Sequence, residues 1–314
     1  MTRILVLRAL GLGDLLTGVP VLRGLRRRHR DARLVLAAPS ALGRWFTDLG
    51  LVDEVLPTPG LAPLRWSGPP PDLAVDLHGR GPQSHRVLRS LAPRSLLAFA
   101  CPGAGHAEGP PWLPDEHEVD RWVRLARWGG LPCSAEDLRL PRDGARGTQV
   151  VVHPGAAAGS RRWPAERWAR VAAALADDGH PVVVTGSAAE TALCSRVADH
   201  PGVVDRCGRD DLPALSGRVA TAAVLLSGDT GPAHLATAHG TPSVVLCGPV
   251  DPAHWGPRID RHLHRVLWHS RPGDPAGDPH ADDVDPRLAR TTVREVLDAA
   301  RAFLPAQPVA SAPG

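Results

Sequence analysis

The polar residues of most chemical interest lie in a turn near residue 230. Asp229 and Thr230 follow an apolar segment, and Gly231, Pro232 and His234 come directly after them. Proline suits the first turn of a helix, so the sequence predicts a helix that begins here and leaves backbone N–H groups free beside the Thr230 hydroxyl and the His234 ring. Such a helix end binds anions and suits a pyrophosphate held without a metal ion. The alternative is an ordinary capped helix, with Asp229 or Thr230 as the cap.

Asp14 is the candidate for proton transfer. It follows the glycine-containing loop 8–13, in which Gly13 precedes it, and it is expected to open an amphipathic helix. A carboxylate at this place can remove the proton of a hydroxyl group as that group attacks another centre. The alternative is that Asp14 caps the helix. The apolar face of the predicted helix consists of Leu15, Val19, Leu22 and Leu25.

Three further side chains are candidates for contact with a nucleotide. Arg161 and Arg162 precede a predicted helix, and the chain contains no lysine, so arginine must make any phosphate contact. The sequence does not decide between these two arginines. Glu190 follows a strand predicted at 181–185 and can accept hydrogen bonds from ribose hydroxyls. An exposed helix glutamate is the alternative.

Candidates on the acceptor side come from the first half of the chain. His78 and Arg80 end a strand predicted at 73–76. His117 and Arg121 fall one turn apart on a predicted helix, where a capping or structural role is the alternative to a role in binding.

The elements around these residues alternate between apolar strands and amphipathic helices. This alternation predicts parallel sheets covered by helices on both faces, with ligands beyond the carboxyl ends of the strands. Two such series, separated by an irregular linker at 132–148, predict an α/β protein with two Rossmann-like domains facing across a cleft. The strands are expected at 4–7, 34–37, 54–56, 73–76, 95–100, 149–152, 181–185, 203–205, 222–226 and 243–246.

Length and composition exclude several classes of function. A chain of 314 residues suffices for two domains, and a net charge of +3 gives no indication of nucleic acid binding. The sequence has no apolar run long enough for an integral membrane segment and no signal peptide, so we expect a cytoplasmic protein. The arginine cluster at 26–30 is interpreted as a solvated helix face, with peripheral contact to an anionic acceptor or membrane as the alternative.

Cofactor and metal signatures are absent from the sequence. The five cysteines contain no CxxC pair, which favours reduced, mostly buried thiols over a disulfide or a structural zinc site. The acidic residues at 282–285 are interpreted as a solvated loop. Neither a complete dinucleotide-binding glycine motif nor a P-loop occurs, which argues against a dehydrogenase or a P-loop kinase. We therefore expect no metal and no cofactor other than a co-substrate.

Four segments together resemble glycosyltransferase family 9, the ADP-heptose:lipopolysaccharide heptosyltransferases and their relatives. The longest is D-T-G-x-x-H-x-A-x-x-x-G-T-P at 229–242, followed by G-P-x-D-P at 248–252. The others are R-x-x-G-x-G-D at 8–14, H-E-V-D-R at 117–121, and H-P-G at 153–155 with R-R-W-P-x-x-R-W at 161–168.

The resemblance implies a GT-B fold with an acceptor-binding domain (1–145), a nucleotide-sugar-binding domain (146–285) and a closing helix that packs toward the N-terminal domain (286–304). Separately, the tail at 305–314 is expected to be disordered. The resemblance also implies an inverting, metal-independent glycosyltransferase that transfers a sugar, expected to be heptose from ADP-heptose, to a glycan, glycolipid or metabolite. Asp14 matches the family's proposed base, and Arg161 matches its phosphate-binding lysine. A nucleotide-sugar epimerase or hydrolase on the same fold, or a non-catalytic nucleotide-sugar-binding protein, is the alternative.

Overall fold

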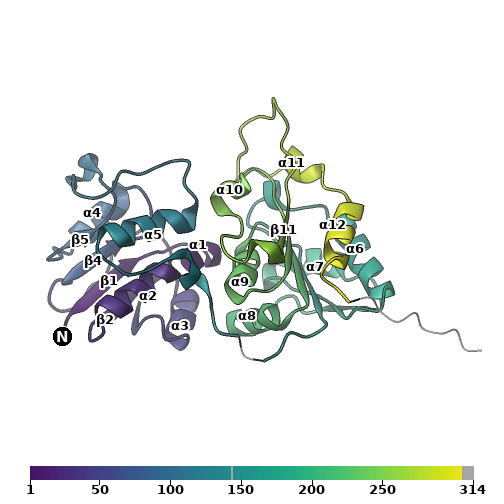
Figure 1. Cartoon of the computed structure of the whole chain (residues 1–314), viewed down its shortest axis with the longest axis horizontal. Coiled ribbons are helices and arrows are strands. Elements are labelled where there is room, and N and C mark those ends of the chain that lie inside the picture. Colours follow the sequence, from purple (N-terminus) through teal and green to yellow (C-terminus); the bar gives the residue numbers. More distant parts are fainter. Residues whose placement is uncertain (143, 306–314) are drawn as a thin grey trace, which may run out of the picture. The chain divides into compact units, whose positions relative to one another are not determined.

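A computed structural model of the protein describes residues 1–142 and 144–305. The chain divides into two compact units, Met1–Leu138 and Arg139–Gly314, called unit 1 and unit 2 below (Figure 1). The sequence predicted the division after residue 145, within the irregular linker, whereas the structure places it at Leu138. The predicted disordered tail at 305–314 lies outside the described residues except for Pro305.

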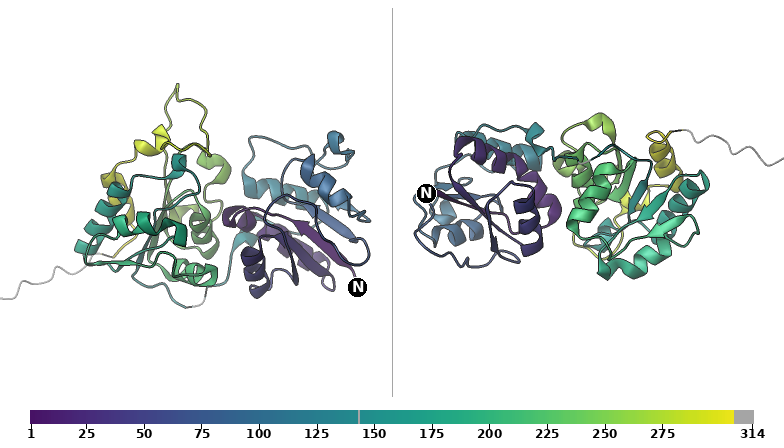
Figure 2. Two further views of the ribbon diagram at one scale, coloured as in Figure 1. Left: turned by 180° about the vertical axis from the view of Figure 1, so that it is seen from behind. Right: turned by 90° about the horizontal axis from the view of Figure 1, so that it is seen from below.

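Unit 1 is built on a parallel sheet with both faces buried. Ile4 and Leu5 point to opposite faces of the first strand, and neither is exposed to solvent. Helices therefore have to cover both faces, and Figure 2 shows them on either side of the sheet. The strand order is β3-β2-β1-β4-β5, with β1 at Arg3–Leu7, β2 at Arg33–Ala38, β3 at Glu54–Pro57, β4 at Leu73–Asp76 and β5 at Leu96–Leu97. The helices are α1 (Leu12–Thr17), α2 (Val19–Arg28), α3 (Ser40–Asp48), α4 (Gln83–Arg89) and α5 (Glu118–Trp128).

Unit 2 repeats this design with six parallel strands. Val150 and Val151, adjacent on its first strand, are both fully buried. The strand order is β11-β10-β9-β6-β7-β8, with β6 at Val150–His153, β7 at Val182–Val184, β8 at Val203–Asp205, β9 at Val224–Gly228, β10 at Ser243–Leu246 and β11 at His264–Leu267. The helices are α6 (Ala165–Asp177), α7 (Thr191–Val197), α8 (Leu212–Thr221), α9 (Gly231–His239), α10 (Pro252–Trp255), α11 (Pro286–Ala289) and α12 (Val293–Arg301). Read from the other edge, this is the order typical of dinucleotide-binding Rossmann domains. The predicted α/β class with two Rossmann-like parallel sheets is confirmed.

Both sheets reverse their strand order beside the first strand of the unit. β1 lies between β2 and β4, and β6 lies between β7 and β9. In parallel α/β sheets, ligands bind beyond the carboxyl ends of the strands at such a reversal. The segments that follow β1, β4, β6 and β9 contain Asp14, His78, Arg161 and Asp229, respectively. The topology thus puts candidate residues at the ligand-binding edge of each sheet.

One strand of unit 2 was not predicted, and the closing helix was. The edge strand β11 was not predicted, because its short His-Arg-Val-Leu sequence lacks a clear strand pattern. The predicted closing helix is present as α12, whose residues Val296 and Ala300 lie in the core of unit 2, where the helix contacts α6 and β10. Its packing toward the N-terminal domain stays a prediction.

Two observations bear on the expected membrane contacts. Among the residues that the structure describes, no helix combines the length and the apolar character needed to cross a bilayer. Part of the arginine cluster at 26–30 is paired, since Arg26 lies 2.8 Å from Asp53 and Arg27 lies 2.6 Å from Asp137. These ion pairs leave less of the cluster's charge available for an anionic surface.

Candidate functional site

The N-terminus of α9 forms one part of a candidate donor site in unit 2. Thr230 is the N-cap residue, yet its hydroxyl makes no capping hydrogen bond and instead donates to the carbonyl of Gly228 at 3.3 Å. The N–H groups of the first turn, which starts at Gly231, are therefore not capped by the side chain of Thr230. An uncapped helix N-terminus presents donors and a positive dipole end to an anion. The simple capped helix considered from the sequence is not what forms here.

Asp229 is flanked by two basic side chains at this helix end. His234 approaches it with Nε2 4.0 Å from Asp229 Oδ1. Burial raises the pKa of Asp229, and the nearby charges of His234 and Arg161 oppose that rise. The His234 ring also contacts the edge of Trp255, with ring centroids 6.0 Å apart. The structure therefore brings Arg161, Asp229 and His234 together, although they come from separate loops and helices.

The two candidate arginines differ in their surroundings. Arg161 is partly buried, and its buried Nε makes no hydrogen bond within the described residues. Arg162 is exposed and donates from Nε to the carbonyl of Ala156 at 2.8 Å. Arg161 also lies close to β9, since a Cβ atom added to Gly228 would be 3.2 Å from the Arg161 carbonyl oxygen. The structure places Arg161, and not Arg162, beside Asp229.

Glu190 lies on the other side of the same sheet edge. The backbone N–H and the hydroxyl of Ser187 each donate to Glu190 Oε2 at 2.8 Å, which forms a capping box. The carboxylate lies over Gly155, where any side chain would overlap it. It also influences His153: burial lowers the pKa of this histidine, and the charge of Glu190 opposes the change. Glu190 is thus half-buried between the loops after β6 and β7, and is not the freely exposed helix residue that was the alternative.

In unit 1, Asp14 lies in the first turn of α1 but does not cap it. The N-cap residue is Gly11, which corrects the alternative that Asp14 caps the helix. The Asp14 side chain is 32% exposed, so solvent or a substrate can reach it. The single helix predicted from Asp14 onward is divided by Gly18 into α1 and α2. Its predicted apolar face is buried, namely Leu15, Val19, Leu22 and Leu25.

Arg8 connects Asp14 to the interior of unit 1. Its guanidinium is 1% exposed and lies 3.7 Å from Asp14 Oδ1. It donates to the backbone carbonyls of Asp14 and Leu77 and to the hydroxyl of Thr17 at 2.8 Å. These bonds fix the end of β1, the helix α1 and the end of β4 to one another. Arg8 was recognised only as a motif residue in the sequence, without a role.

The charge of Arg8 is balanced by a second motif on α5. Glu118 Oε1 accepts from Arg8 at 3.2 Å and from the Trp122 indole at 2.8 Å, while Oε2 pairs with Arg121. The Arg8 guanidinium also lies 4.7 Å from the centre of the Trp122 ring. Glu118 and Arg121 are each 6% exposed, so this is a buried ionic network. Arg121, predicted one turn from His117 on a helix, lies inside unit 1 and has the structural role that was the alternative to binding.

His78 lies next to this network at the end of β4. Its ring Nδ1 accepts from the backbone N–H of Ala9 at 3.3 Å, and its backbone N–H donates to Asp76 Oδ1 at 2.9 Å. Burial lowers the pKa of His78, with opposing contributions from Asp76 and Asp14 and a further lowering by Arg8. Asp76 itself is fully buried, and its Oδ2 lies 3.0 Å from Nδ1 of His85. The structure therefore brings His78 close to Asp14, and Asp76 holds the backbone of His78 through a hydrogen bond.

The remaining acceptor-side candidates are less central. His117 is the N-cap of α5, and its ring accepts from the Val119 N–H at 3.2 Å, which is the capping role considered from the sequence. Arg80 is exposed. Gly13 lies within α1, directly before Asp14.

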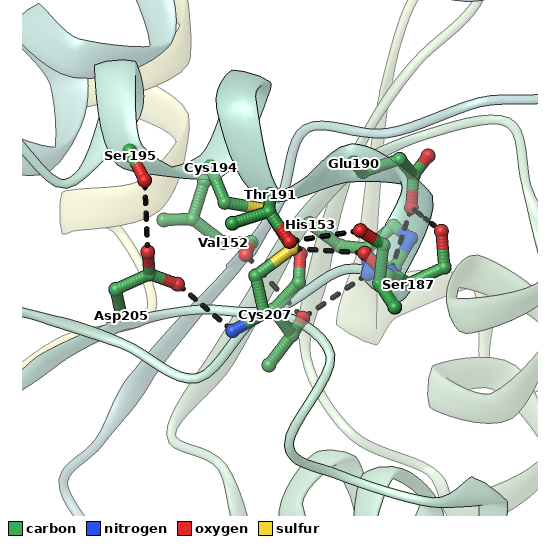
Figure 3. Close-up of a disulfide and its surroundings, with 11 residues drawn as sticks. Val152, His153, Ser187, Glu190, Thr191, Cys194, Ser195, Asp205 and Cys207 are labelled. Carbon is green, nitrogen blue, oxygen red and sulfur yellow. Dashed lines mark hydrogen bonds between the residues drawn. A yellow bond between two sulfur atoms is a disulfide. The ribbon is translucent and has the colours of Figure 1, made fainter.

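The prediction that all five cysteines are reduced is wrong. Cys194 and Cys207 form a disulfide, where reduced thiols were expected, and their Cα atoms are 6.2 Å apart (Figure 3). Cys101, Cys133 and Cys247 are free. Within the described residues, the one group of side chains spaced to hold a metal ion is Cys194, Asp205 and Cys207. The residues at 282–285 do not form such a group, and Asp285 caps α11 and pairs with Arg287 at 3.1 Å.

The sequence of this chain matches the model of one protein family over part of its length. The model of glycosyltransferase family 9 (heptosyltransferase) matches residues 128–272, a segment that includes the group around Asp229 but not Asp14. Lipopolysaccharide heptosyltransferase 2 of Escherichia coli is 25% identical over 96% of this chain and 98% of its own. Lipooligosaccharide heptosyltransferase 2 of Haemophilus influenzae is 27% identical over 46% of each chain.

Solved structures show the same fold. A family 9 glycosyltransferase from Veillonella parvula superposes with a TM-score of 0.78 at 18% identity, covering 96% of this chain and 97% of its own. The E. coli heptosyltransferase WaaC, solved with ADP, superposes with a TM-score of 0.73 at 18% identity, covering 96% and 100%. The predicted GT-B fold is thereby confirmed. This chain is similar to the heptosyltransferases of glycosyltransferase family 9 in sequence and in fold.

Proposed function

We propose that this enzyme is an inverting, metal-independent glycosyltransferase that moves heptose from ADP-heptose to a hydroxyl of a glycan, glycolipid or metabolite. ADP is the nucleotide named for the related WaaC structure, and ADP-heptose is named for E. coli heptosyltransferase II. We propose that this chain uses the same donor nucleotide and sugar as these related proteins.

The group at the N-terminus of α9 carries the proposal. A diphosphate has charge to be balanced and many acceptor oxygens, and here it would meet Arg161, His234 and the uncapped N–H groups of the first turn. The buried Nε of Arg161, which makes no hydrogen bond within the described residues, is a donor that a phosphate oxygen would satisfy. Glu190 would accept from the ribose hydroxyls, with Ser187 holding its carboxylate.

Asp14 is the proposed general base. It would take the proton of the acceptor hydroxyl as the oxygen attacks the anomeric carbon and the bond to the diphosphate breaks. The departing nucleoside diphosphate needs no protonation, because its charge is stabilised by the arginine, the histidine and the helix end. Arg8 would hold Asp14 in place from the buried side, and the exposed part of the carboxylate would face the acceptor.

Titration with ADP, UDP and GDP tests the donor. We expect selective binding of ADP that depends on Arg161. Selective binding of UDP or GDP would change the donor while leaving the site in place, and failure of all three nucleotides to bind would reject the site.

Turnover of ADP-heptose across a panel of hydroxyl acceptors tests the reaction. Inversion requires that the product have the anomeric configuration opposite to that of the donor, which NMR determines directly. Unchanged turnover after treatment with EDTA is expected for a metal-independent enzyme. Consumption of donor without any acceptor would indicate a hydrolase or an epimerase, and binding without turnover would indicate a non-catalytic protein.

A further inference from the structure

The disulfide of unit 2 lies against the turn that leads to Glu190. Cys194 lies on α7 and Cys207 lies just after β8, so the bond (Figure 3) links the helix that follows β7 to the segment that follows the neighbouring strand β8. Gly186 packs against the disulfide, because a Cβ atom there would be 2.7 Å from each sulfur. Only a residue without a side chain can pass both sulfur atoms this closely.

The backbone of the turn is held directly against these sulfur atoms. Cys207 Sγ lies 3.1 Å from the carbonyl oxygen of Ser187, and Cys194 Sγ lies 3.8 Å from that of Thr185. The N–H of Gly208, next to Cys207, donates to the carbonyl of Gly186 at 2.9 Å. The position of Ser187 therefore depends on where the two cysteines are.

Ser187 in turn determines the position of the Glu190 carboxylate. Both hydrogen bonds that hold Glu190 Oε2 come from Ser187, from its N–H and from its hydroxyl (Figure 3). A displacement of Ser187 would move this carboxylate away from Gly155 and from the edge of the sheet. The contacts thus form a continuous path from the two sulfurs to the proposed ribose ligand.

We propose that Cys194 and Cys207 are a redox-responsive pair, and that their oxidation state sets the affinity of the site for the nucleotide by positioning the Ser187–Glu190 turn. This inference rests on the proposed function, in which Glu190 contacts the ribose. If the protein lies in the cytoplasm, as the sequence predicts, the bond falls in the class of cytosolic disulfides, which are mostly catalytic or redox-sensing.

The chemistry is thiol–disulfide exchange with a low-molecular-weight disulfide as oxidant. Cys207 is 8% exposed and Cys194 is fully buried, so the Cys207 thiolate would attack the oxidant and release one thiol. The Cys194 thiolate would then displace the second thiol from the mixed disulfide. The protein loses two electrons and two protons, and the oxidant gains them as two thiols.

A metal ion is the competing use of the same side chains, since Asp205 lies beside both sulfurs. Asp205 Oδ1 already accepts from the Cys207 N–H at 2.8 Å and Oδ2 from the Ser195 hydroxyl at 3.5 Å. Structural zinc takes four ligands, and this group offers three. The geometry therefore favours the disulfide.

The test compares fully reduced protein with protein oxidised by glutathione disulfide. Counting thiols under denaturing conditions measures the state directly, with five free cysteines expected after reduction and three after oxidation. We expect ADP to bind about threefold to tenfold more tightly to the oxidised protein, as for partial loss of one charged hydrogen bond. Equal ADP affinity in two states with confirmed thiol counts would overturn the proposal.

Three variants separate positioning from general stabilisation. Cys194→Ser should bind ADP at the weak level in both conditions, whereas Cys101→Ser, which leaves the pair intact, should keep the full response. Glu190→Gln should lose most of the redox response in ADP affinity but keep any redox-dependent change in melting temperature. If Glu190→Gln still shows the full response, the path through Glu190 is wrong.

Hydrogen exchange distinguishes failure of this inference from failure of the proposed function. Backbone amides at 186–190 should exchange more slowly in the oxidised protein, whether or not ADP binds. Slower exchange without ADP binding in either state would reject the donor site and retain control of the turn by the disulfide. Equal exchange in both states, or one tightly bound zinc ion with thiols that cannot be oxidised, would overturn the redox pair itself.

Discussion

The two candidate sites differ in how their polar groups are partnered. Around Asp14 in unit 1, charges alternate within the protein, from Asp14 to Arg8 to Glu118 to Arg121, and the last three are almost completely buried. Around Asp229 in unit 2, Arg161 keeps a buried Nε that makes no hydrogen bond within the described residues, and α9 has no side-chain cap.

The difference in hydrogen-bond partners agrees with two different roles, a general base in unit 1 and a phosphate-binding site in unit 2. A base has to be held in one place by the protein itself, so its surroundings are complete before a substrate arrives. A phosphate-binding site has to leave donors available, and the ligand completes it. The predictions below test this contrast, starting with the largest expected effect.

Replacing Asp14 should remove turnover without affecting the donor. We expect Asp14→Ala and Asp14→Asn to lower kcat by about 10²- to 10⁴-fold, the usual contribution of a general base. ADP affinity, measured by calorimetry, should stay within about twofold, because Asp14 is proposed to contact only the acceptor. A large loss of ADP affinity would contradict the separation of roles between the two units.

Replacing Arg8 should destabilise the protein, because it leaves Glu118 as a buried, poorly compensated charge. We expect Arg8→Met to lower the free energy of unfolding by about 3–5 kcal/mol in urea titrations. The control is Arg33→Met, which breaks the exposed ion pair with Glu54 at 2.8 Å and should change stability by less than about 1 kcal/mol. Equal losses in the two variants would show that the buried network does not stabilise unit 1 in this way.

Acid should destabilise the protein through a buried histidine of unit 2. Burial lowers the pKa of His264 from 6.5 to about 4, and the ring shares a hydrogen bond of 2.8 Å with the Ser243 hydroxyl. The unfolded chain binds this proton below pH 6.5 and the folded protein only near pH 4. The free energy of unfolding should therefore fall by about 3 kcal/mol between these pH values.

Variants can assign this acid sensitivity to His264. Replacement by glutamine should remove most of the pH dependence in that range, whereas the exposed His262→Gln should retain it. A profile that is the same in all three proteins would show that His264 does not titrate as described.

Replacing Arg161 should have the smallest effect of this series, limited to donor binding. We expect Arg161→Ala to weaken ADP binding by about 10- to 100-fold, the contribution of one or two charged hydrogen bonds. Arg162→Ala is the matched control, since its side chain is exposed and bonds to Ala156, and its ADP affinity should change less than twofold. The opposite order would place Arg162 in the site.

The sequence by itself determined the class of fold and the loops that matter. Apolar strands and amphipathic helices depend on local periodicity, so every predicted strand was found. Asp14, His78, Arg161 and Asp229 lie in the segments that follow the carboxyl ends of strands. The strand β11 was missed because an edge strand of four residues carries little periodic signal.

Only the tertiary structure decided which side chains meet. Local sequence treats Arg161 and Arg162 alike, and the path of the loop beside β9 turns just one of them toward Asp229. Arg8 and Glu118 are far apart in the chain, and packing of α5 joins them. Cys194 and Cys207 lack the spacing of a local cysteine motif and come together because β7 and β8 are neighbours in the sheet. Contacts of this kind depend on strand order and helix packing, which are properties of the whole unit and leave no mark on the spacing of residues.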